Sequence, residues 1–190
     1  MHPIIQKICQ KTIRKQKNNS GAPWQNAAHC LPRNFTTTAR RAARLLRPSS
    51  LTDQLFIKAK RIRSLEIKKE SLVGEGIRPE FIALINYGIV GLIQLEMGFA
   101  DTPDISADEA LAIYDKKADE ALQLMIRKNH DYDEAWRSMR VSSYTDFILT
   151  KIQRVKEIED IHGATLVSEG IDANYMDIIN YAVFGLIKLS

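Results

Sequence analysis

The sequence contains little cysteine, and its excess of basic residues is confined to one end. Its two cysteines are Cys9 and Cys30, so nothing from Asp53 onward can form a disulfide, and we expect a reducing, cytoplasmic setting. Residues 1–52 contain ten Lys or Arg and no acid, which leaves 17 basic and 23 acidic residues after them. A nucleic-acid partner is therefore not expected for the folded part, because phosphate backbones require a basic surface stripe.

The sequence also lacks a membrane span and the common catalytic motifs. The two most apolar stretches, 81–95 and 175–189, are short and contain Asn86 and Asn180. Since a bilayer requires about 20 apolar residues, we expect buried helices and no membrane partner. His130 and His162 have no Cys or His at metal-binding spacing, and no Ser-His-acid set or strand-linked glycine loop stands out.

A tandem duplication is the main feature that the sequence does contain. Residues 44–62 align with 137–155 at eight identities in 19 positions, and residues 72–95 align with 166–189 at 12 in 24. We therefore divide the chain into three parts: a basic leader, 1–43; a truncated first repeat, 44–100; and a second repeat with a connecting helix, 101–190.

Each repeat has the pattern of a helical hairpin. Ser142, Ser143 and Thr145 offer capping oxygens before an apolar-periodic run that Gly163 should end. The second helix of the hairpin is predicted over about 171–189, and its counterpart in the first repeat over 77–97.

A further helix is predicted between the repeats, over 107–128. Ser106 and Glu109 have the spacing of a capping box at its start. Because there is almost no strand signal, the predicted fold is an all-α helical bundle, built from two helical-hairpin units packed around a pseudo-two-fold axis.

The basic leader has no visible counterpart of this connecting helix. One interpretation is a transit peptide, because the segment is basic, contains hydroxyl residues and has no acid. The other is an out-of-frame reading: codons for residues 36–41, shifted by one nucleotide, can encode Asp-Tyr-Gly-Ala-Ala, which is similar to residues 131–135. On either interpretation we expect residues 1–43 to be poorly ordered.

Several polar residues are the same in both repeats. Lys151 and Arg154 of the second repeat, for example, match Lys58 and Arg61 of the first. These two cations lie three residues apart on one helix face and could hold phosphate oxygens, or they could pair with acids of a neighbouring helix. Tyr132 and Trp136 could stack on a base, although an aromatic residue at such a junction often only closes the core.

Polar residues also lie along one side of the last helix. Glu169, Asp172, Asp177 and Asn180 fall within about 140° of arc at 100° per residue. Oxygen ligands so placed suit Mg²⁺, while the first two could instead cap the helix. The amide of Asn180 either pairs across the repeat axis or faces a polar site, since a buried amide requires hydrogen bonds.

The duplicated motifs "DYxxAWRxxRxSSxTDxxxxKxxR" and "LVSEGIxxxxxDIINYAVFGLIKL" resemble the bacterial and phage family called nucleotide modification associated, whose function is unknown. The resemblance covers about 44–190. More distantly, "NYMDIINYAVFGL" is similar to the last helix of MazG-like all-α nucleoside triphosphate pyrophosphatases, which bind Mg²⁺ with E-x-x-E and E-x-x-D motifs. Asp177 matches the Asp of E-x-x-D, and Asn174 stands where its Glu would be; the first repeat has Glu80 and Ala83 at these positions.

The resemblance implies a Mg²⁺-dependent pyrophosphohydrolase that cuts a nucleoside triphosphate between its α and β phosphates, and related enzymes assemble sites between units, which makes a homodimer a possible partner. On this hypothesis Asp146 and Glu169 are catalytic, and Glu169, Asp172 and Asp177 bind the metal. The nucleotide would contact the following residues: Tyr132, Trp136, Arg137, Arg140, Lys151, Arg154 and Asn180. The alternative is a non-catalytic nucleotide-binding or helical interaction module in nucleotide or DNA modification.

Overall fold

The computed structural model describes residues 43–102, 104–161 and 170–189, which form helices and no strand. The predicted all-α class is therefore confirmed, while most of the leader, Gly163 and Glu169 lie outside the described residues. The elements are α3 Pro48–Lys68, α4 Arg78–Met97, α5 Ala107–Asp131, the short 3₁₀ helix η3 Ala135–Ser138, α6 Val141–Asp160 and α7 Ile171–Lys188.

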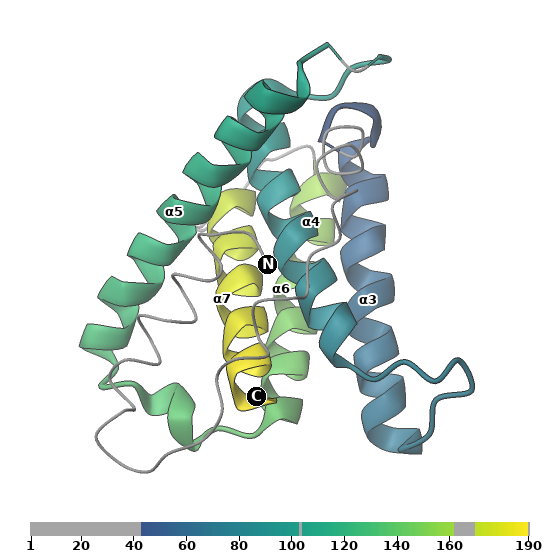
Figure 1. Ribbon diagram of the computed structural model, residues 1–190, viewed down its shortest axis with the longest axis vertical. Helices are drawn as coiled ribbons and strands as arrows, with labels where there is room; N and C mark the ends of the chain where they lie inside the picture. Colours follow the sequence, from purple (N-terminus) through teal and green to yellow (C-terminus); the bar gives the residue numbers. More distant parts are fainter. Residues whose placement is uncertain (1–42, 103, 162–169, 190) are drawn as a thin grey trace.

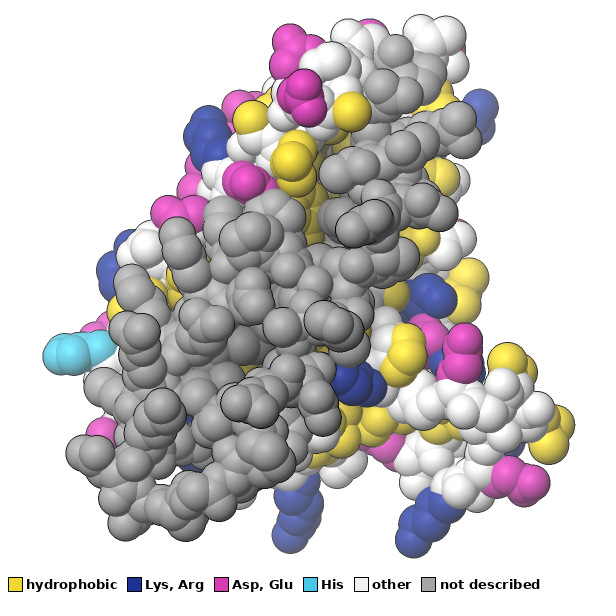
Figure 2. Space-filling model, viewed as in Figure 1, with side chains coloured by type: hydrophobic (Ala, Val, Ile, Leu, Met, Phe, Trp, Pro, Cys, Tyr) yellow, Lys and Arg dark blue, Asp and Glu magenta, His cyan; other side chains and the backbone are white. Residues whose placement is uncertain are grey.

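Four of these helices form a bundle. α3 packs on α4 and α6, and α7 also packs on α4 and α6, so each helical hairpin contacts the other through both of its helices. Figure 1 shows α4 and α7 near the centre, with α5 running obliquely along one side. The outer side of α5 carries both basic and acidic side chains (Figure 2), as expected for a helix with one face in solvent.

The bundle core follows the apolar periodicity of the sequence. The positions at i, i+4 and i+7 of α6 are fully buried, and so are their counterparts on α3. Burying a large aliphatic side chain stabilises the fold by about 1.5–3 kcal/mol. The six residues are Ile148, Ile152 and Val155 on α6, and Leu55, Ala59 and Ile62 on α3.

Polar contacts between α3 and α6 are reciprocal, as a pseudo-two-fold axis requires. A residue of the first repeat contacts a residue of the second, and the counterparts of both make the same contact with the roles exchanged. Two are hydrogen bonds, from Thr52 to Glu159 (2.7 Å) and from Thr145 to Glu66 (2.9 Å). Two are ion pairs, of Asp53 with Lys156 (2.7 Å) and of Asp146 with Arg63.

The contact between α4 and α7 has the same symmetry, with an aromatic ring of each helix against a glycine of the other. A Cβ on Gly91 would lie 2.6 Å from the Tyr175 ring, and a Cβ on Gly185 would lie 2.7 Å from the Phe81 ring. Gly91 corresponds to Gly185, and Phe81 corresponds to Tyr175. Both glycines are needed for the close approach of these two helices, because a Cβ at either position would overlap the facing ring.

Arg44 fixes the segment between α4 and α5. Its guanidinium is buried and donates two hydrogen bonds, of 2.6 and 2.7 Å, to the carboxylate of Asp104. It also donates to the backbone carbonyl groups of Met97 and Gly98, at 3.1 and 2.5 Å. One buried cation therefore holds three points of the connection that precedes α5.

The starts of α5 and α6 differ in how they match the sequence. The capping box of Ser106 and Glu109 is present at the start of α5, so that prediction is confirmed. α6 begins at Val141 with no side-chain cap, so the prediction that Ser142, Ser143 or Thr145 caps it was wrong. Both serines lie inside the first turn.

Among the described residues, α4 alone has the length and hydropathy that a membrane-spanning helix requires. Of its most apolar window, 61% is buried inside the protein. The core helix of a helical bundle passes the same criterion, and α4 contacts α3, α5 and α7.

Candidate functional site

Two lysines from different helices converge on one carboxylate of α7. The Asp177 carboxylate is largely buried; Lys128 of α5 donates to its Oδ1 at 2.5 Å, and Lys151 of α6 lies 2.9 Å from its Oδ2. We call these three residues the lysine–aspartate cluster. Of the charges predicted to converge, Lys151 and Asp177 meet, and the third member of the cluster, Lys128, was not predicted.

The first repeat also has a buried carboxylate that pairs with two cations, but the carboxylate lies at a different position. Glu80 of α4 is buried and pairs with Lys58 at 3.2 Å and with Arg61. Ala83, one turn later, is the counterpart of Asp177. The acid has thus moved by one helical turn between the repeats, and in the second repeat the counterpart of Glu80 is an uncharged amide.

That amide belongs to Asn174 and lacks a full set of partners. Its side chain is fully buried, its Nδ2 donates to the Gly170 carbonyl at 2.8 Å, and its Oδ1 has no partner among the described residues. Asn180, three residues beyond Asp177, is 5% exposed, and its Nδ2 likewise has no partner in the described part. A buried amide group without a hydrogen bond costs about 1–3 kcal/mol.

The counterpart of Asn180 in the first repeat does have a partner. The Oδ1 of Asn86 accepts a hydrogen bond of 2.8 Å from Tyr114 of α5. The prediction that this amide pairs across the repeat axis or faces a polar site therefore remains open for Asn180. It lies on the same helix as Asp177, close to the lysine–aspartate cluster in sequence.

Aromatic side chains lie next to this cluster. The ring centroids of Phe147 on α6 and Tyr181 on α7 are 5.4 Å apart, and the ring planes are tilted by 43°. Tyr132, just after the end of α5, is 71% exposed. Burial raises the pKa of Tyr181, and the charges of Asp177, Lys151 and Lys128 are close enough to modulate this pKa. The phenol is therefore neutral at pH 7 and can act as a hydrogen-bond donor.

Trp136 lies in the core rather than in an open site. It is 5% exposed and stacks on Phe184, with ring centroids 4.7 Å apart and an angle of 6° between the ring planes. The guanidinium of Arg137 lies 4.4 Å from the centre of its ring, and this arginine pairs with Glu134 at 2.8 Å. These contacts favour the simpler interpretation that Trp136 closes the core.

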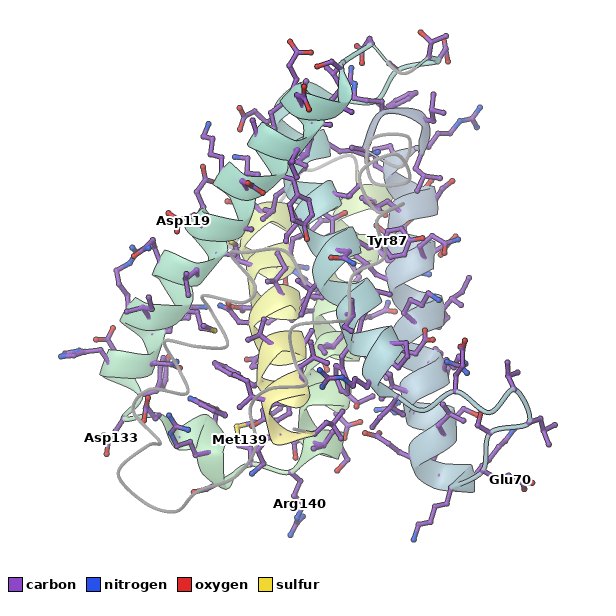
Figure 3. The ribbon with its side chains drawn as sticks, in the orientation of Figure 1. Glu70, Tyr87, Asp119, Asp133, Met139 and Arg140 are labelled. Carbon is purple, nitrogen blue, oxygen red and sulfur yellow. The ribbon has the colours of Figure 1, made fainter. Side chains whose placement is uncertain are left out.

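The turn before Trp136 is strained. Asp133 and Glu134 have φ values of 48° and 53°, in the left-handed region that residues with a Cβ rarely adopt. Such backbone costs of the order of 1–3 kcal/mol each and persists where surrounding contacts fix it. Here it turns the chain so that η3 can bring Trp136 to Phe184. Asp133 lies at the far end of α5 in Figure 3.

The remaining predicted cations do not join the cluster. Arg154 pairs with Glu157 of its own helix at 3.3 Å, and Arg140, which caps the start of α6 through its backbone, is exposed. Figure 3 shows the Arg140 side chain pointing away from the bundle. Their roles in binding a nucleotide stay predictions.

The predicted acids are also spread apart. Asp146 is exposed and pairs with Arg63, so it lies between the repeats rather than beside Asp177. Asp172 is exposed in the first turn of α7, and Glu169 lies outside the described residues. Within 43–102, 104–161 and 170–189, no group of three His, Cys, Asp or Glu side chains is placed to bind a metal.

Sequence reasoning missed three residues of this region: Lys128, Phe147 and Tyr181. Retention in both repeats directed attention to Lys151, but Phe147 and Asp177 stand where the first repeat has Gln54 and Ala83. A difference between the repeats was the signal that could have found Phe147, whereas Tyr181 is a tyrosine in both repeats. Lys128 offered no such signal, because its partner lies 49 residues away on another helix.

Comparison with known families assigns both repeats. Residues 22–95 and 128–189 match the family described as nucleotide modification associated domain 1. The chain belongs to this family. The first match to nucleotide modification associated domain 1 begins inside the basic leader, and most of α5 lies between the two matches. Neither a curated protein nor a solved structure matches the chain, so the distant similarity to MazG-like pyrophosphatases stays a prediction.

Proposed function

We propose that the second repeat binds a nucleoside triphosphate together with Mg²⁺ and hydrolyses it between the α and β phosphates. The lysine–aspartate cluster is the observation that carries this proposal. Ammonium groups complement phosphate oxygens, and a carboxylate complements Mg²⁺. A pair of lysines around one aspartate therefore offers groups of the opposite sign to both parts of a Mg²⁺–phosphate unit. The name of the family, nucleotide modification associated, agrees with a nucleotide ligand.

The cluster fits a metal that arrives with the nucleotide better than a resident ion. Both oxygens of Asp177 already contact an ammonium group, and the two lysines outnumber the acid. A bare Mg²⁺ would have to displace these cations without offering them another partner. Phosphates would provide that partner and free the carboxylate.

On this proposal the cations and the acids of the second repeat have different roles. Lys128 and Lys151 bind phosphate oxygens, and Asp177 holds the metal together with Asp172, in the first turn of α7, and with Glu169. Bound Mg²⁺ would polarise the phosphate and lower the pKa of water. Glu169 would accept the proton of the attacking water.

A second candidate is nucleotide binding without turnover. It is favoured by the spread of the acids, since Asp146 is paired with Arg63 and Asp172 is exposed. In that case the cluster recognises phosphates and no bond is broken.

Pyrophosphate release from a panel of dNTPs with Mg²⁺, measured together with binding, separates the two. Lys151→Ala should abolish release and weaken binding, whereas Lys58→Ala, its counterpart in the first repeat, should change neither. Binding without release, lost in Lys151→Ala, would support the second candidate. If the intact chain binds no nucleotide, both candidates are wrong. Light scattering on the same samples tests the predicted homodimer.

A further inference from the structure

Two aromatic rings stand one helical turn from the lysine–aspartate cluster. Phe147 precedes Lys151 by four residues on α6, and Tyr181 follows Asp177 by four residues on α7, so each ring shares a helix face with one member of the cluster. The centroids of the two rings lie 5.4 Å apart, although the rings come from different helices. The two rings therefore lie one helical turn from Lys151 and Asp177, where α6 packs on α7.

Phe147 packs on Tyr181 and keeps part of its surface in solvent. Its side chain is 42% exposed on a helix whose inward positions are fully buried. Leaving a large aromatic surface in water forgoes the stabilisation that burial would give. The ring is held in place by Tyr181 and still presents accessible surface, which is the geometry of a stacking platform.

The first repeat supports this interpretation by contrast. It has Gln54 at the position of Phe147 and Ala83 at the position of Asp177, while Tyr87 is kept as the counterpart of Tyr181. Figure 3 shows Tyr87 on the side of α4 that faces α3. The platform and the cluster thus occur together in the second repeat and are both missing from the described part of the first.

We propose that Phe147 and Tyr181 form the platform on which the base of the bound nucleotide stacks. This inference rests on the proposed function, because the cluster would hold the phosphates while the rings hold the base. Trp136 is not available for this role, since it is buried against Phe184. Stacking is tolerant of base identity because every base has a π face. The ligand class is therefore any purine or pyrimidine nucleoside triphosphate.

Titrations with dATP and with tripolyphosphate, each with Mg²⁺, test the inference on the full chain. Tripolyphosphate has the three linked phosphates of the nucleotide, with one more ionisable oxygen, and has no sugar or base. Phe147→Gln introduces the residue type of the first repeat and should weaken dATP binding about tenfold, while tripolyphosphate binding stays within about twofold. Tyr181→Leu should act in the same direction. Phe99→Gln, at a comparably exposed phenylalanine outside the contact between α6 and α7, should change neither ligand.

The outcomes separate the inference from the proposed function. Selective loss of dATP affinity in Phe147→Gln supports the platform. Equal loss for both ligands, no loss for either, or wild-type protein that binds dATP no more tightly than tripolyphosphate overturns the platform and leaves phosphate binding intact. Failure of the wild-type protein to bind either ligand overturns the proposed function and the platform with it.

Discussion

The hydroxyl of Thr145 donates a hydrogen bond of 2.9 Å to the carboxylate of Glu66, which belongs to the other repeat. Thr52 and Glu159 make the same contact at 2.7 Å. Each threonine lies near the start of its helix and each glutamate near the end of its helix. The two contacts therefore require α3 and α6 to run antiparallel around a local two-fold axis. The two repeats are held together by contacts that each contributes in equal measure.

Removing either threonine hydroxyl should destabilise the fold. Thr145→Val and Thr52→Val keep the side-chain shape and leave a half-buried carboxylate without its donor, so each should lower the free energy of unfolding by about 1–2 kcal/mol. Urea denaturation measures this. Thr150→Val is the control, because that hydroxyl is exposed and bonds only to the backbone of its own helix. Equal losses in all three variants would contradict the prediction.

The same carboxylates should make stability depend on pH. Burial raises the pKa of Glu66 and of Glu159, so their contribution to stability is fully present below about pH 4 and is lost as the pH rises through the folded pKa values. Relative to wild type, Glu66→Gln/Glu159→Gln should therefore gain stability as the pH is raised from about 4 to 7. Unfolding at a series of pH values tests this, with exposed Glu70→Gln as control. A difference that is constant with pH would refute it.

Arg44 should be needed to hold α5 in place. Arg44→Ala removes four hydrogen bonds to Asp104, Met97 and Gly98, and should cost about 2–3 kcal/mol. Hydrogen exchange should increase in the first turns of α5. Arg47→Ala, which removes an exposed arginine three residues away, should have little effect. Similar results for both arginines would show that the buried clamp is not needed.

Adding a methyl group between α4 and α7 should force the helices apart. Gly91→Ala and Gly185→Ala place a Cβ within 2.6–2.7 Å of Tyr175 and Phe81, so each should cost about 1–3 kcal/mol. Gly76→Ala, where no atom lies within 4 Å, should stay within about 0.5 kcal/mol of wild type. Thermal or urea denaturation decides, and wild-type stability of Gly91→Ala would sink the prediction.

The arrangement of the first repeat should be transferable to the second. Asn174→Glu/Asp177→Ala restores the acid one turn earlier, where Lys151 and Arg154 correspond to Lys58 and Arg61. The variant should fold with a stability within about 1 kcal/mol of wild type, because the same buried pairing already exists in the first repeat. It should lose nucleotide binding.

The reverse exchange in the first repeat, Glu80→Asn/Ala83→Asp, is the matched control for this variant. It should leave nucleotide affinity unchanged, since the second repeat keeps its cluster. Unaltered affinity in the Asn174→Glu/Asp177→Ala variant would show that the cluster is not the binding site.

Much of the fold could be predicted from the sequence because the duplication showed which segments form one unit. The helix predicted over 171–189 is observed over Ile171–Lys188, and that over 77–97 over Arg78–Met97. The apolar periodicity of α6 located its core positions. The start of α6 was less predictable, since serines near a helix start can cap it or lie within its first turn.

The candidate site was predictable only in part. The sequence indicated that Lys151 and Asp177 would share a site, but it could not show that Asp146 pairs with Arg63 across the repeats. A polar residue kept in both repeats can contact a ligand or the other repeat, and only the packing distinguishes the two. For Trp136, stacking on Phe184 depends on a turn whose positive φ values no sequence pattern announced.

The reciprocal contacts between α3 and α6 have a consequence for how the two halves can diverge. None of them involves residues 147, 174 or 177, at which α6 and α7 of the second repeat differ in side-chain chemistry from their counterparts in the first. Substitutions at these positions change the charges and rings of the second repeat and leave the contacts between α3 and α6 in place. A duplicated fold of this kind can therefore acquire new surface chemistry in one repeat while the two repeats stay joined.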